Sequence, residues 1–318
     1  MIRRFQIQNN TLIESESEDS PVQVFINPDS EEKDILLRTY DIDQHTLTSA
    51  LDPDEVSRVE ISPEQTFLIY KRPKNYSSQD NFFFNVTSVG LILLKERLVM
   101  ISSEDIPLIE AGFKHSHEIH STLDLMLNFL HDTVYHFLGH LKVIKQVARE
   151  LEQKITASIE NKHLIQMFNL SESLVYYINA INSNSGVLGK LRNHIEKTGF
   201  SSETIEHLDD IIIDNNQCYE QAKTYSTVFA GLMDARGNLV NNNMNVLLRK
   251  LTIINVVFLP LNLIAGIGGM SEFTMMTRGI NWRTSYFLFL AAMVLIGWLT
   301  AFFLGRMNFG RNIARMKK

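Results

Sequence analysis

Hydrophobic and polar positions follow three different patterns along the chain. Up to about residue 110, short apolar runs alternate with turn signals, which is typical of strands intermixed with short helices. Between Pro107 and Pro260 there is no proline, and apolar residues recur every three or four positions, which predicts long helices. Beyond Lys250, two runs of about 20 residues contain no charged side chain. We therefore expect an α and β region, a long helical region and two very apolar helices.

The first region is expected to form a sheet covered by helices, which gives an α+β fold. Asp29 and Ser30 supply N-cap chemistry for a helix over residues 31–38, and a second short helix is expected over 44–51. Strands are expected over residues 22–26, 66–71, 82–87, 89–94 and 98–102, with the last two joined as a hairpin by Lys95-Glu96-Arg97.

Three long helices are expected after residue 110. The first carries a regular apolar row, which consists of Ile119, Leu123, Met126, Leu130, Val134, Phe137 and Leu141. The second covers about 163–194, with a weak point expected at Asn182–Gly186. Ser201 or Ser202 caps the third, which meets no stop signal before Gly266–Gly269. At 1.5 Å per residue the third helix is about 95–100 Å long, and so long a helix needs partners, which implies a stalk or bundle.

Two segments are predicted to cross a membrane as helices. Leu251–Met270 and Tyr286–Leu304 are each long enough to span a hydrocarbon core of about 30 Å. Arg249 and Lys250 precede the first segment and five basic residues follow the second, so the positive-inside rule places both chain termini in the cytoplasm. We expect a two-span protein of the inner or plasma membrane, with residues 271–285 on the outer side. The N-terminus shows no apolar signal region.

Charge is distributed unevenly between these parts. The 318 residues carry a formal charge of −6, but seven basic residues and one acid follow Lys250, so that segment is +6 and residues 1–250 are −12. An acidic body with an apolar, basic-tailed end indicates a membrane protein and not a nucleic-acid-binding polycation. The single cysteine, Cys218, excludes a disulfide scaffold and a zinc finger with several thiolates. No nucleophile elbow, phosphate-binding glycine loop or HExxH sequence occurs, so an enzyme is not expected.

A polar stripe runs along the third long helix into the first membrane segment. Its positions are separated alternately by four and three residues, so they share one face of a slightly supercoiled helix. They are Asp234, Asn238, Asn241, Asn245, Leu248, Thr252, Asn255, Leu259, Asn262 and Gly266. In a soluble coiled coil this seam would be apolar. Polar side chains at membrane depth need a partner or water, so the stripe is either glue between packed helices or the lining of a pore.

Two features favour a pore. The stripe begins below the membrane and crosses most of it, and its Asn positions alternate with Leu248 and Leu259, which suit hydrophobic gates. Two spans cannot enclose a pore, so several copies of the chain must assemble. Amide oxygens and the Asp234 carboxylate suit hard divalent cations such as Mg²⁺. Because Mg²⁺ sheds water reluctantly, we expect these rings to bond a hydrated ion, with Glu272 concentrating cations at the outer mouth.

The first membrane segment resembles that of CorA-type magnesium channels. The residues that carry the resemblance are Met244-Asn245, Thr252-Ile253-Ile254, Phe258-x-Pro260-Leu261 and Ile264-Ala265-Gly266-Ile267-x-Gly269-Met270. The short loop, the second span, the basic tail and the order of elements extend the resemblance over the chain. It implies a funnel-shaped homopentamer that conducts divalent cations, has its first membrane helix around the pore and carries no covalent cofactor. The expected selectivity loop consists of Gly269, Met270, Ser271 and Glu272.

The sequence departs from the family pattern at two kinds of position. The signature Gly-Met-Asn reads Gly269-Met270-Ser271 here, so a hydroxyl replaces an amide at the pore entrance, and Gly268 stands where an aromatic residue is usual. The family senses magnesium through acidic pairs between subunits. By this resemblance Asp210 is the expected regulatory metal ligand, whereas its partner position holds Ser49, with Asp52 nearby.

The expected organisation comprises a cytoplasmic α/β domain (1–110), a cytoplasmic helical stalk (111–250), a pore-lining first membrane helix (251–270), an external loop (271–285), a second membrane helix (286–305) and a basic cytoplasmic tail (306–318). The expected function is conduction of hydrated Mg²⁺, or of Co²⁺ or Ni²⁺, by copies that assemble with themselves in a lipid bilayer. Two alternatives stay open. One is transport of another cation such as Zn²⁺, and the other is a non-conducting, membrane-anchored scaffold.

The ten histidines raise the question of a metal site. His136 and His140 are four residues apart on one helical face, and His115, His117 and His120 are close in sequence. Such spacing is a weak signal. Solvated stalk histidines are therefore expected, with a regulatory transition-metal site as the alternative.

Overall fold

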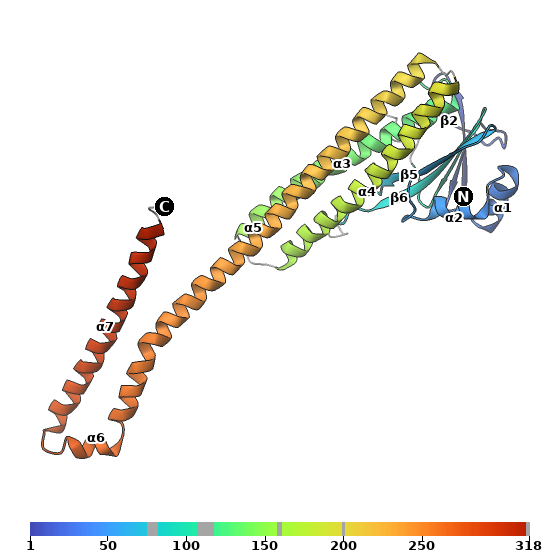
Figure 1. Ribbon diagram of the computed structural model, residues 1–318. Coiled ribbons are helices and arrows are strands. Elements are labelled where there is room, and N and C mark those ends of the chain that lie inside the picture. Colours follow the sequence, from blue (N-terminus) through green and yellow to red (C-terminus); the bar gives the residue numbers. More distant parts are fainter. Residues whose placement is uncertain (75–81, 107–117, 158–160, 199–200, 316–318) are drawn as a thin grey trace. The chain divides into compact units, whose positions relative to one another are not determined.

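The computed structural model describes residues 1–74, 82–106, 118–157, 161–198 and 201–315. The chain divides into two compact units, Met1–Gly231 and Leu232–Lys318. In chain order the elements shown in Figure 1 are β1 (Ile2–Gln8), β2 (Thr11–Glu14), β3 (Val22–Ile26), α1 (Ser30–Thr39), α2 (Gln44–Leu51), β4 (Arg58–Ile61), β5 (Gln65–Pro73), β6 (Val86–Leu94), β7 (Leu98–Ser102), α3 (Thr122–Ala157), α4 (Asn161–Thr198), α5 (Ser202–Gly268), α6 (Ser271–Met276) and α7 (Trp282–Arg315).

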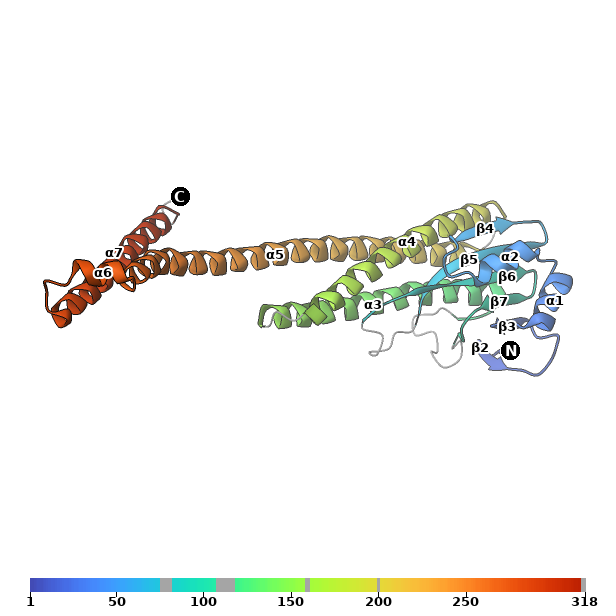
Figure 2. The ribbon, with the colours of Figure 1, turned by 90° about the horizontal axis from the view of Figure 1, so that it is seen from below.

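A sheet of seven strands forms the centre of the first unit, in the order β2-β1-β3-β7-β6-β5-β4. The strands β3 and β7 pair in parallel, with Val22 opposite Leu98, and the other neighbours pair antiparallel. Figures 1 and 2 show α1 and α2 beside this sheet, where α2 packs against β6 and β7, whereas α3 and α4 pack against β5. The predicted α+β class, the strands at 22–26 and 98–102 and the hairpin of β6 with β7 are confirmed.

Alternate residues of the strands serve two apolar layers, because successive side chains of a strand point to opposite faces. In β5, Phe67 and Ile69 belong to the hydrophobic cluster that also contains residues of α1 and α2. Leu68 and Tyr70, the alternate residues of the same strand, are completely buried on the other face, where α3 and α4 pack. The strand β5 is therefore covered on both faces, which explains its nearly continuous apolar sequence.

Both short helices form where their cap residues predict them. The Asp29 side chain accepts a hydrogen bond from the Glu32 amide at 2.9 Å, and the Glu32 carboxylate accepts one from the Asp29 amide at 3.1 Å. Asp43 caps α2 through its side chain in a similar way. The approach of α2 to the sheet requires Gly90, since a Cβ there would lie 2.7 Å from the Cβ of Ala50.

Two local predictions are wrong. Residues 82–87 and 89–94 do not form two strands, because Phe82 lies in a turn at φ +62° and the single strand β6 covers Val86–Leu94. The weak point at Asn182–Gly186 does not exist either, because α4 continues through it. Asn184 is fully buried there, and its amide bonds the N–H and the C=O of Lys71 in β5, at 2.9 and 2.8 Å. A residue that resembles a helix breaker in the sequence thus joins α4 to the sheet.

The long helices confirm the predicted spacing. The apolar row predicted for the first long helix is buried, with exposures of 9% or less at Ile119, Leu123, Met126, Leu130, Val134, Phe137 and Leu141, although α3 begins only at Thr122, after Ile119. The helix α5 ends at Gly268, inside the predicted stop at Gly266–Gly269. Two helices, Ser202–Gly268 and Trp282–Phe303, contain a stretch that is long and apolar enough to cross a membrane.

Some stalk histidines are buried, so the prediction that they are solvated is wrong for them. His140 is 6% exposed, its Nδ1 lies 2.6 Å from the Tyr177 hydroxyl, and its ring centroid is 4.4 Å from that of His136. Burial lowers the pKa of His140 to about 3, with His136 and Arg72 adding to the effect. Burial and Arg72 lower the pKa of His136 to about 4. His115 and His117 lie outside the described residues.

Acidification is expected to destabilise the first unit through these two histidines. In the unfolded chain both titrate near pH 6.5, so below that value the unfolded state binds more protons than the folded state. Their contribution is complete above pH 6.5 and is lost toward pH 4, at up to about 1.4 kcal/mol per pH unit for each histidine. Thermal unfolding of the full-length protein between about pH 7.5 and 5 measures this loss. His140→Asn, which keeps a polar group beside Tyr177, should reduce the slope by up to about 1.4 kcal/mol per pH unit, and an unchanged slope would contradict this assignment.

Candidate functional site

The polar stripe lies on an exposed face of α5. All of its residues, from Asp234 to Gly266, are exposed, with Leu248 at 53% and Leu259 at 71%. The Thr252 hydroxyl donates to the carbonyl of Leu248, one turn earlier, at 2.8 Å. Within the described part of the chain, the Asn side chains of the stripe make no hydrogen bond. The Asn side chains of the stripe therefore have no hydrogen-bond partner within the described residues.

A different face of α5 contacts α7. Leu261 approaches Gly297, where an added Cβ would lie 3.3 Å from the Leu261 Cδ1 atom. Leu261, Ala265 and Gly268 line one side of an apolar cavity of about 530 Å³ that α7 closes on the other. At ~100° per residue this row lies roughly 120° around the helix from the stripe. Packing of α5 on α7 therefore leaves the stripe open, and glue within one chain does not explain its polar side chains.

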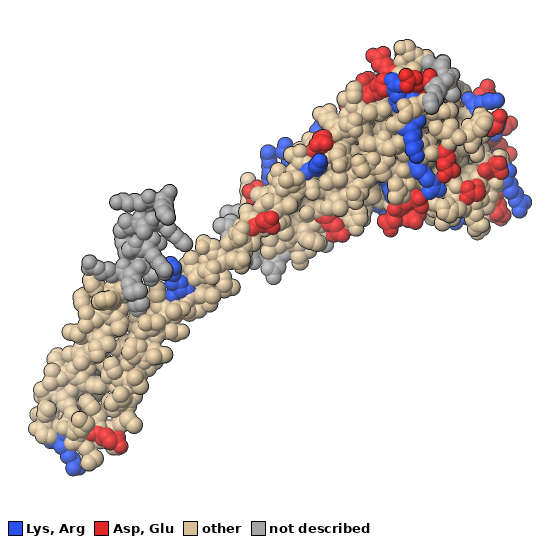
Figure 3. Space-filling view, in the orientation of Figure 1, with Lys and Arg blue, Asp and Glu red and all other residues tan. Residues whose placement is uncertain are grey.

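Charged side chains are sparse on the second unit. Figure 3 shows Lys, Arg, Asp and Glu spread over the visible face of the first unit, whereas the visible face of the second unit carries few of them and is uncharged over a long stretch. The uncharged length includes the membrane-compatible stretches of α5 and α7. The Asn residues at 255 and 262 are thus polar positions within an otherwise apolar surface.

The expected selectivity loop is a tight turn that leads into α6. The amide of Gly269 donates to the carbonyls of Ala265 and Gly266 at 3.1 and 3.2 Å. Ser271 and Glu272 are exposed in the first turn of α6, and the Ser271 hydroxyl donates to the Glu272 carboxylate at 3.3 Å. The turn therefore presents a hydroxyl and a carboxylate together, next to the end of the stripe at Gly266.

Two aromatic residues that the sequence analysis did not single out contact this turn. Phe289 of α7 lies against Gly268, and its ring centroid is 5.3 Å from that of Phe273 in α6. Both residues stand in apolar runs, where an aromatic side chain is ordinary, so no motif marks them. Their contact depends on how α7 packs, which the local sequence does not reveal.

The regulatory pair that the resemblance implies is incomplete. Asp210 is exposed on α5, but Ser49 is 5% exposed in α2 and offers no accessible ligand. Asp52 is exposed after α2, and its carboxylate accepts a hydrogen bond from the Asp54 amide at 2.9 Å. Ser49, where the resemblance leads us to expect a second acid, therefore offers no charge to a metal ion.

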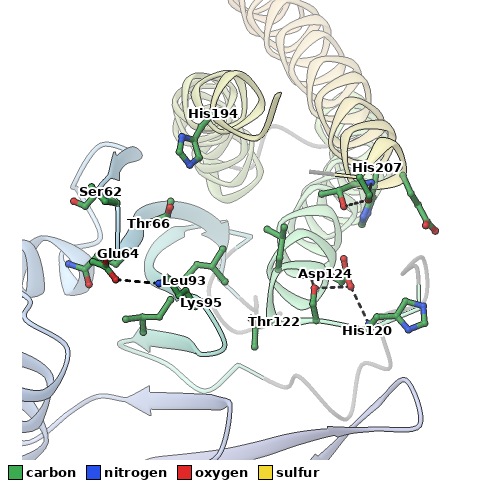
Figure 4. Close-up of a pocket in the computed structure, with 18 of the residues that line it drawn as sticks. Ser62, Glu64, Thr66, Leu93, Lys95, His120, Thr122, Asp124, His194 and His207 are labelled. Atoms are coloured by element: carbon green, nitrogen blue, oxygen red, sulfur yellow. Dashed lines mark hydrogen bonds and ion pairs between the residues drawn. The ribbon is translucent and has the colours of Figure 1, made fainter. Parts of the chain in front are cut away.

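A cavity of about 660 Å³ in the first unit gathers polar side chains from the β4–β5 turn, the end of β6 and the ends of α3, α4 and α5 (Figure 4). Glu64 and Lys95 line one side, 3.9 Å apart, and Asp124 accepts a hydrogen bond from the His120 amide at 3.2 Å on another. His194 projects from α4, apart from both pairs. Within the described ranges, no group of three or more His, Cys, Asp or Glu side chains is arranged to hold a metal ion.

Known proteins resemble this chain along most of its length. The family described as "CorA-like Mg2+ transporter protein" matches residues 24–306. The chain is 27% identical over 282 residues to the "Cobalt/magnesium transport protein CorA" of Methanocaldococcus jannaschii, with 85% of each chain covered. It is 29% identical over 146 residues to the protein of the same name from Thermotoga maritima, which covers 46% of this chain and 41% of that one.

Solved structures share the fold. The complete structure of the CorA magnesium transporter from Methanocaldococcus jannaschii superposes with a TM-score of 0.76 at 21% identity, covering 96% of this chain and 98% of that one. The ZntB cytoplasmic domain from Vibrio parahaemolyticus superposes with a TM-score of 0.56 at 9% identity, over 76% of this chain and 97% of that one. This chain therefore shares an α+β domain, long helices and two candidate membrane helices with the complete Methanocaldococcus jannaschii structure. The chain belongs to the CorA-like Mg²⁺ transporter family, whose members transport divalent cations and are not enzymes.

Proposed function

We propose that several copies of this chain surround a central pore and conduct a hydrated divalent cation, most readily Mg²⁺, with Co²⁺ or Ni²⁺ as further cargo. The observation that carries this proposal is the stripe, which is polar, exposed and located on a face of α5 that α7 leaves uncovered. Polar side chains at membrane depth require water or polar partners. Several copies of α5 around a pore would provide both, because the pore contains water and the neighbouring stripes are polar. The resemblance to CorA favours a homopentamer.

In such an assembly, each stripe residue repeats in every copy and forms a ring around the pore, and each kind of ring would have its own role. Asp234 would attract cations at the inner end, and the amides would hold the hydration shell of the ion by hydrogen bonds. Leu248 and Leu259 would form constrictions that close by losing water. Thr252 and Gly266 would complete the lining, and Glu272 would attract cations at the outer end.

The proposed topology follows the distribution of basic residues. Residues 1–250 and the basic tail at 306–318 lie in the cytoplasm, and the segment 271–285 lies outside, in the inner or plasma membrane of the cell. The cytoplasmic part divides into an α/β domain up to residue 110 and a stalk. Asp210 stands on that stalk, where a second subunit would have to provide the further ligands of a regulatory metal site.

Ion flux tests this function directly. Purified protein in liposomes should admit Mg²⁺ down its gradient, and Mg²⁺, Co²⁺, Ni²⁺ and Zn²⁺ should be compared side by side with matched gradients. Faster entry of Mg²⁺ than of Zn²⁺ is expected. Preference for Zn²⁺ would favour the zinc-transport alternative, and absence of flux for all four ions would favour a non-conducting scaffold.

Changes at the turn before α6 are expected to alter this flux. Ser271→Asn adds a longer amide that reaches a hydrated ion, so the Mg²⁺-to-Co²⁺ flux ratio should change by about fivefold, the effect of one hydrogen bond of about 1 kcal/mol. Glu272→Gln removes a ring of charge and should lower uptake mainly at low external cation. Met276→Leu, at a residue that is 86% exposed in the same helix, is the matched control. Unchanged flux and ratio in both test variants would exclude this turn from the selectivity site.

A further inference from the structure

The turn that carries Ser271 and Glu272 is held at both ends by one ring of α7. On the α5 side, a Cβ built on Gly268 would lie 2.9 Å from the Cε1 and Cε2 atoms of Phe289, with Cζ also in contact. Real Cβ atoms are not found so close to a ring. The phenyl ring of Phe289 therefore occupies the space that a side chain at position 268 would need.

On the α6 side, the same ring contacts Phe273. Their centroids are 5.3 Å apart with an interplanar angle of 57°, which is a favourable tilted arrangement. Phe273 is itself fixed to the turn, because its amide donates to the carbonyl of Met270 at 3.2 Å. Phe289 thus contacts the residue before the segment 269–272, Gly268, and the residue after it, Phe273.

Little else in the described residues orients the two polar side chains. Ser271 bonds only its neighbour Glu272, at 3.3 Å, and the N-cap residue of α6, Met270, makes no side-chain cap hydrogen bond. A short helix without a side-chain cap has little stability of its own, so its position depends on tertiary contacts. Within the chain, the packing of Phe273 against Phe289 is a tertiary contact of this kind.

We infer that Phe289 is a positioning residue for ion selection, which holds the Ser271–Glu272 turn in place by filling the space beside Gly268 and contacting Phe273. The inference rests on the proposed function, since the turn matters for transport only if it stands at the pore entrance. The alternative is ordinary packing between two membrane helices, in which Phe289 stabilises the pair without affecting the turn.

The experiment compares four variants of the full-length protein with the wild type. Phe289→Ala removes the ring, and Gly268→Ala displaces it. The double variant Gly268→Phe with Phe289→Ala moves the aromatic ring from α7 back to α5. Phe287→Ala, at a 72% exposed residue two positions earlier in α7, removes an aromatic ring that does not line the cavity beside Gly268.

Two readouts separate positioning from packing. Hydrogen exchange of residues 271–276 reports the turn without any ion flux, and it should accelerate about tenfold in Phe289→Ala and in Gly268→Ala. The Mg²⁺-to-Co²⁺ flux ratio in liposomes should change several-fold in the same two variants. The double variant should restore both values toward those of the wild type, and Phe287→Ala should leave both unchanged.

The outcomes are distinguishable from failure of the proposed function. If exchange of 271–276 is unchanged in Phe289→Ala, or if the double variant restores neither value, the inference is overturned. If Ser271→Asn changes the flux ratio but Phe289→Ala does not, the inference fails while the proposed function stands. If exchange responds as expected but the wild type conducts no ion, Phe289 still positions the turn and the proposed function is wrong.

Discussion

Asn255→Leu is expected to lower divalent-cation flux at least about tenfold. Asn255 is exposed on α5 at a level where the neighbouring sequence is apolar, and nothing within the described chain bonds its amide. In the proposed pore, one amide from every subunit bonds the water around the ion at this level. Leucine replaces that ring by an apolar constriction one turn from Leu259, and adjacent apolar rings exclude water. A barrier increase of about 1.4 kcal/mol suffices for a tenfold loss.

The measurement is Mg²⁺ entry into liposomes that contain equal amounts of each variant. Asn255→Ser keeps a polar group and should retain much of the flux. Val256→Leu, at a neighbouring residue that is 47% exposed off the stripe, is the control for a change of apolar bulk. If the stripe is glue between helices, Asn255→Leu instead weakens the oligomer, which size-exclusion chromatography in detergent would reveal, while flux per intact oligomer stays unchanged.

The stripe was predictable because its signal belongs to a single helix. Alternating gaps of four and three residues define one helical face whatever the helix packs against. The structure adds that this face is exposed and that α7 uses another face. Assembly around a pore was not predictable from the spacing alone, because the spacing determines which residues share a face and not what that face contacts.

Strand prediction succeeded in the most buried strands and missed β1, β2 and β4, which lie toward the two edges of the sheet. In β7 every residue is buried, and its apolar run stands out in the sequence. In β1 and β4 only one residue each is buried, Phe5 and Val59, so neither strand shows a clear alternation. Arg3 and Arg4 further obscure β1, although Arg3 bonds Glu14 of the paired strand at 3.1 Å. Such strands are specified by their neighbours rather than by their own pattern.

Contacts between distant residues were not predictable for a similar reason. Gly268 appears in the sequence only as a departure from the family pattern, and Phe289 as one of several aromatic residues in an apolar run. Their relation appears only when α7 lies against α5. The role of Asn184 in the first unit was equally unpredictable. In a solvent-exposed helix face an Asn weakens the helix, whereas in a core it can bond a neighbouring strand, and the sequence does not tell which face it occupies.

Asn184→Leu is expected to destabilise the protein by about 3–5 kcal/mol, among the largest effects of a single substitution. The strand β4 pairs with β5 only as far as Arg58 opposite Ile69, so Lys71 has no strand partner on that side. The Asn184 amide takes the place of the missing strand, and its Oδ1 also accepts a bond from the Ser57 hydroxyl at 2.7 Å. Leucine has a similar volume but leaves the buried N–H and C=O of Lys71 without these bonds, at roughly 1–3 kcal/mol for each, whereas the Ser57 hydroxyl keeps the Ser183 hydroxyl at 2.9 Å as a partner.

Thermal unfolding of the full-length protein in detergent measures the loss, which should lower the midpoint by about 10 °C, since 1 kcal/mol shifts a unit of this size by about 2–4 °C. Asn182→Leu is the matched control, because Asn182 is exposed on the same helix, within the segment that the sequence marks as weak. It should change the midpoint little. Equal midpoints for the two variants would mean that the Asn184 amide contributes no more than a surface residue, and that α4 is held to the sheet by its apolar contacts alone.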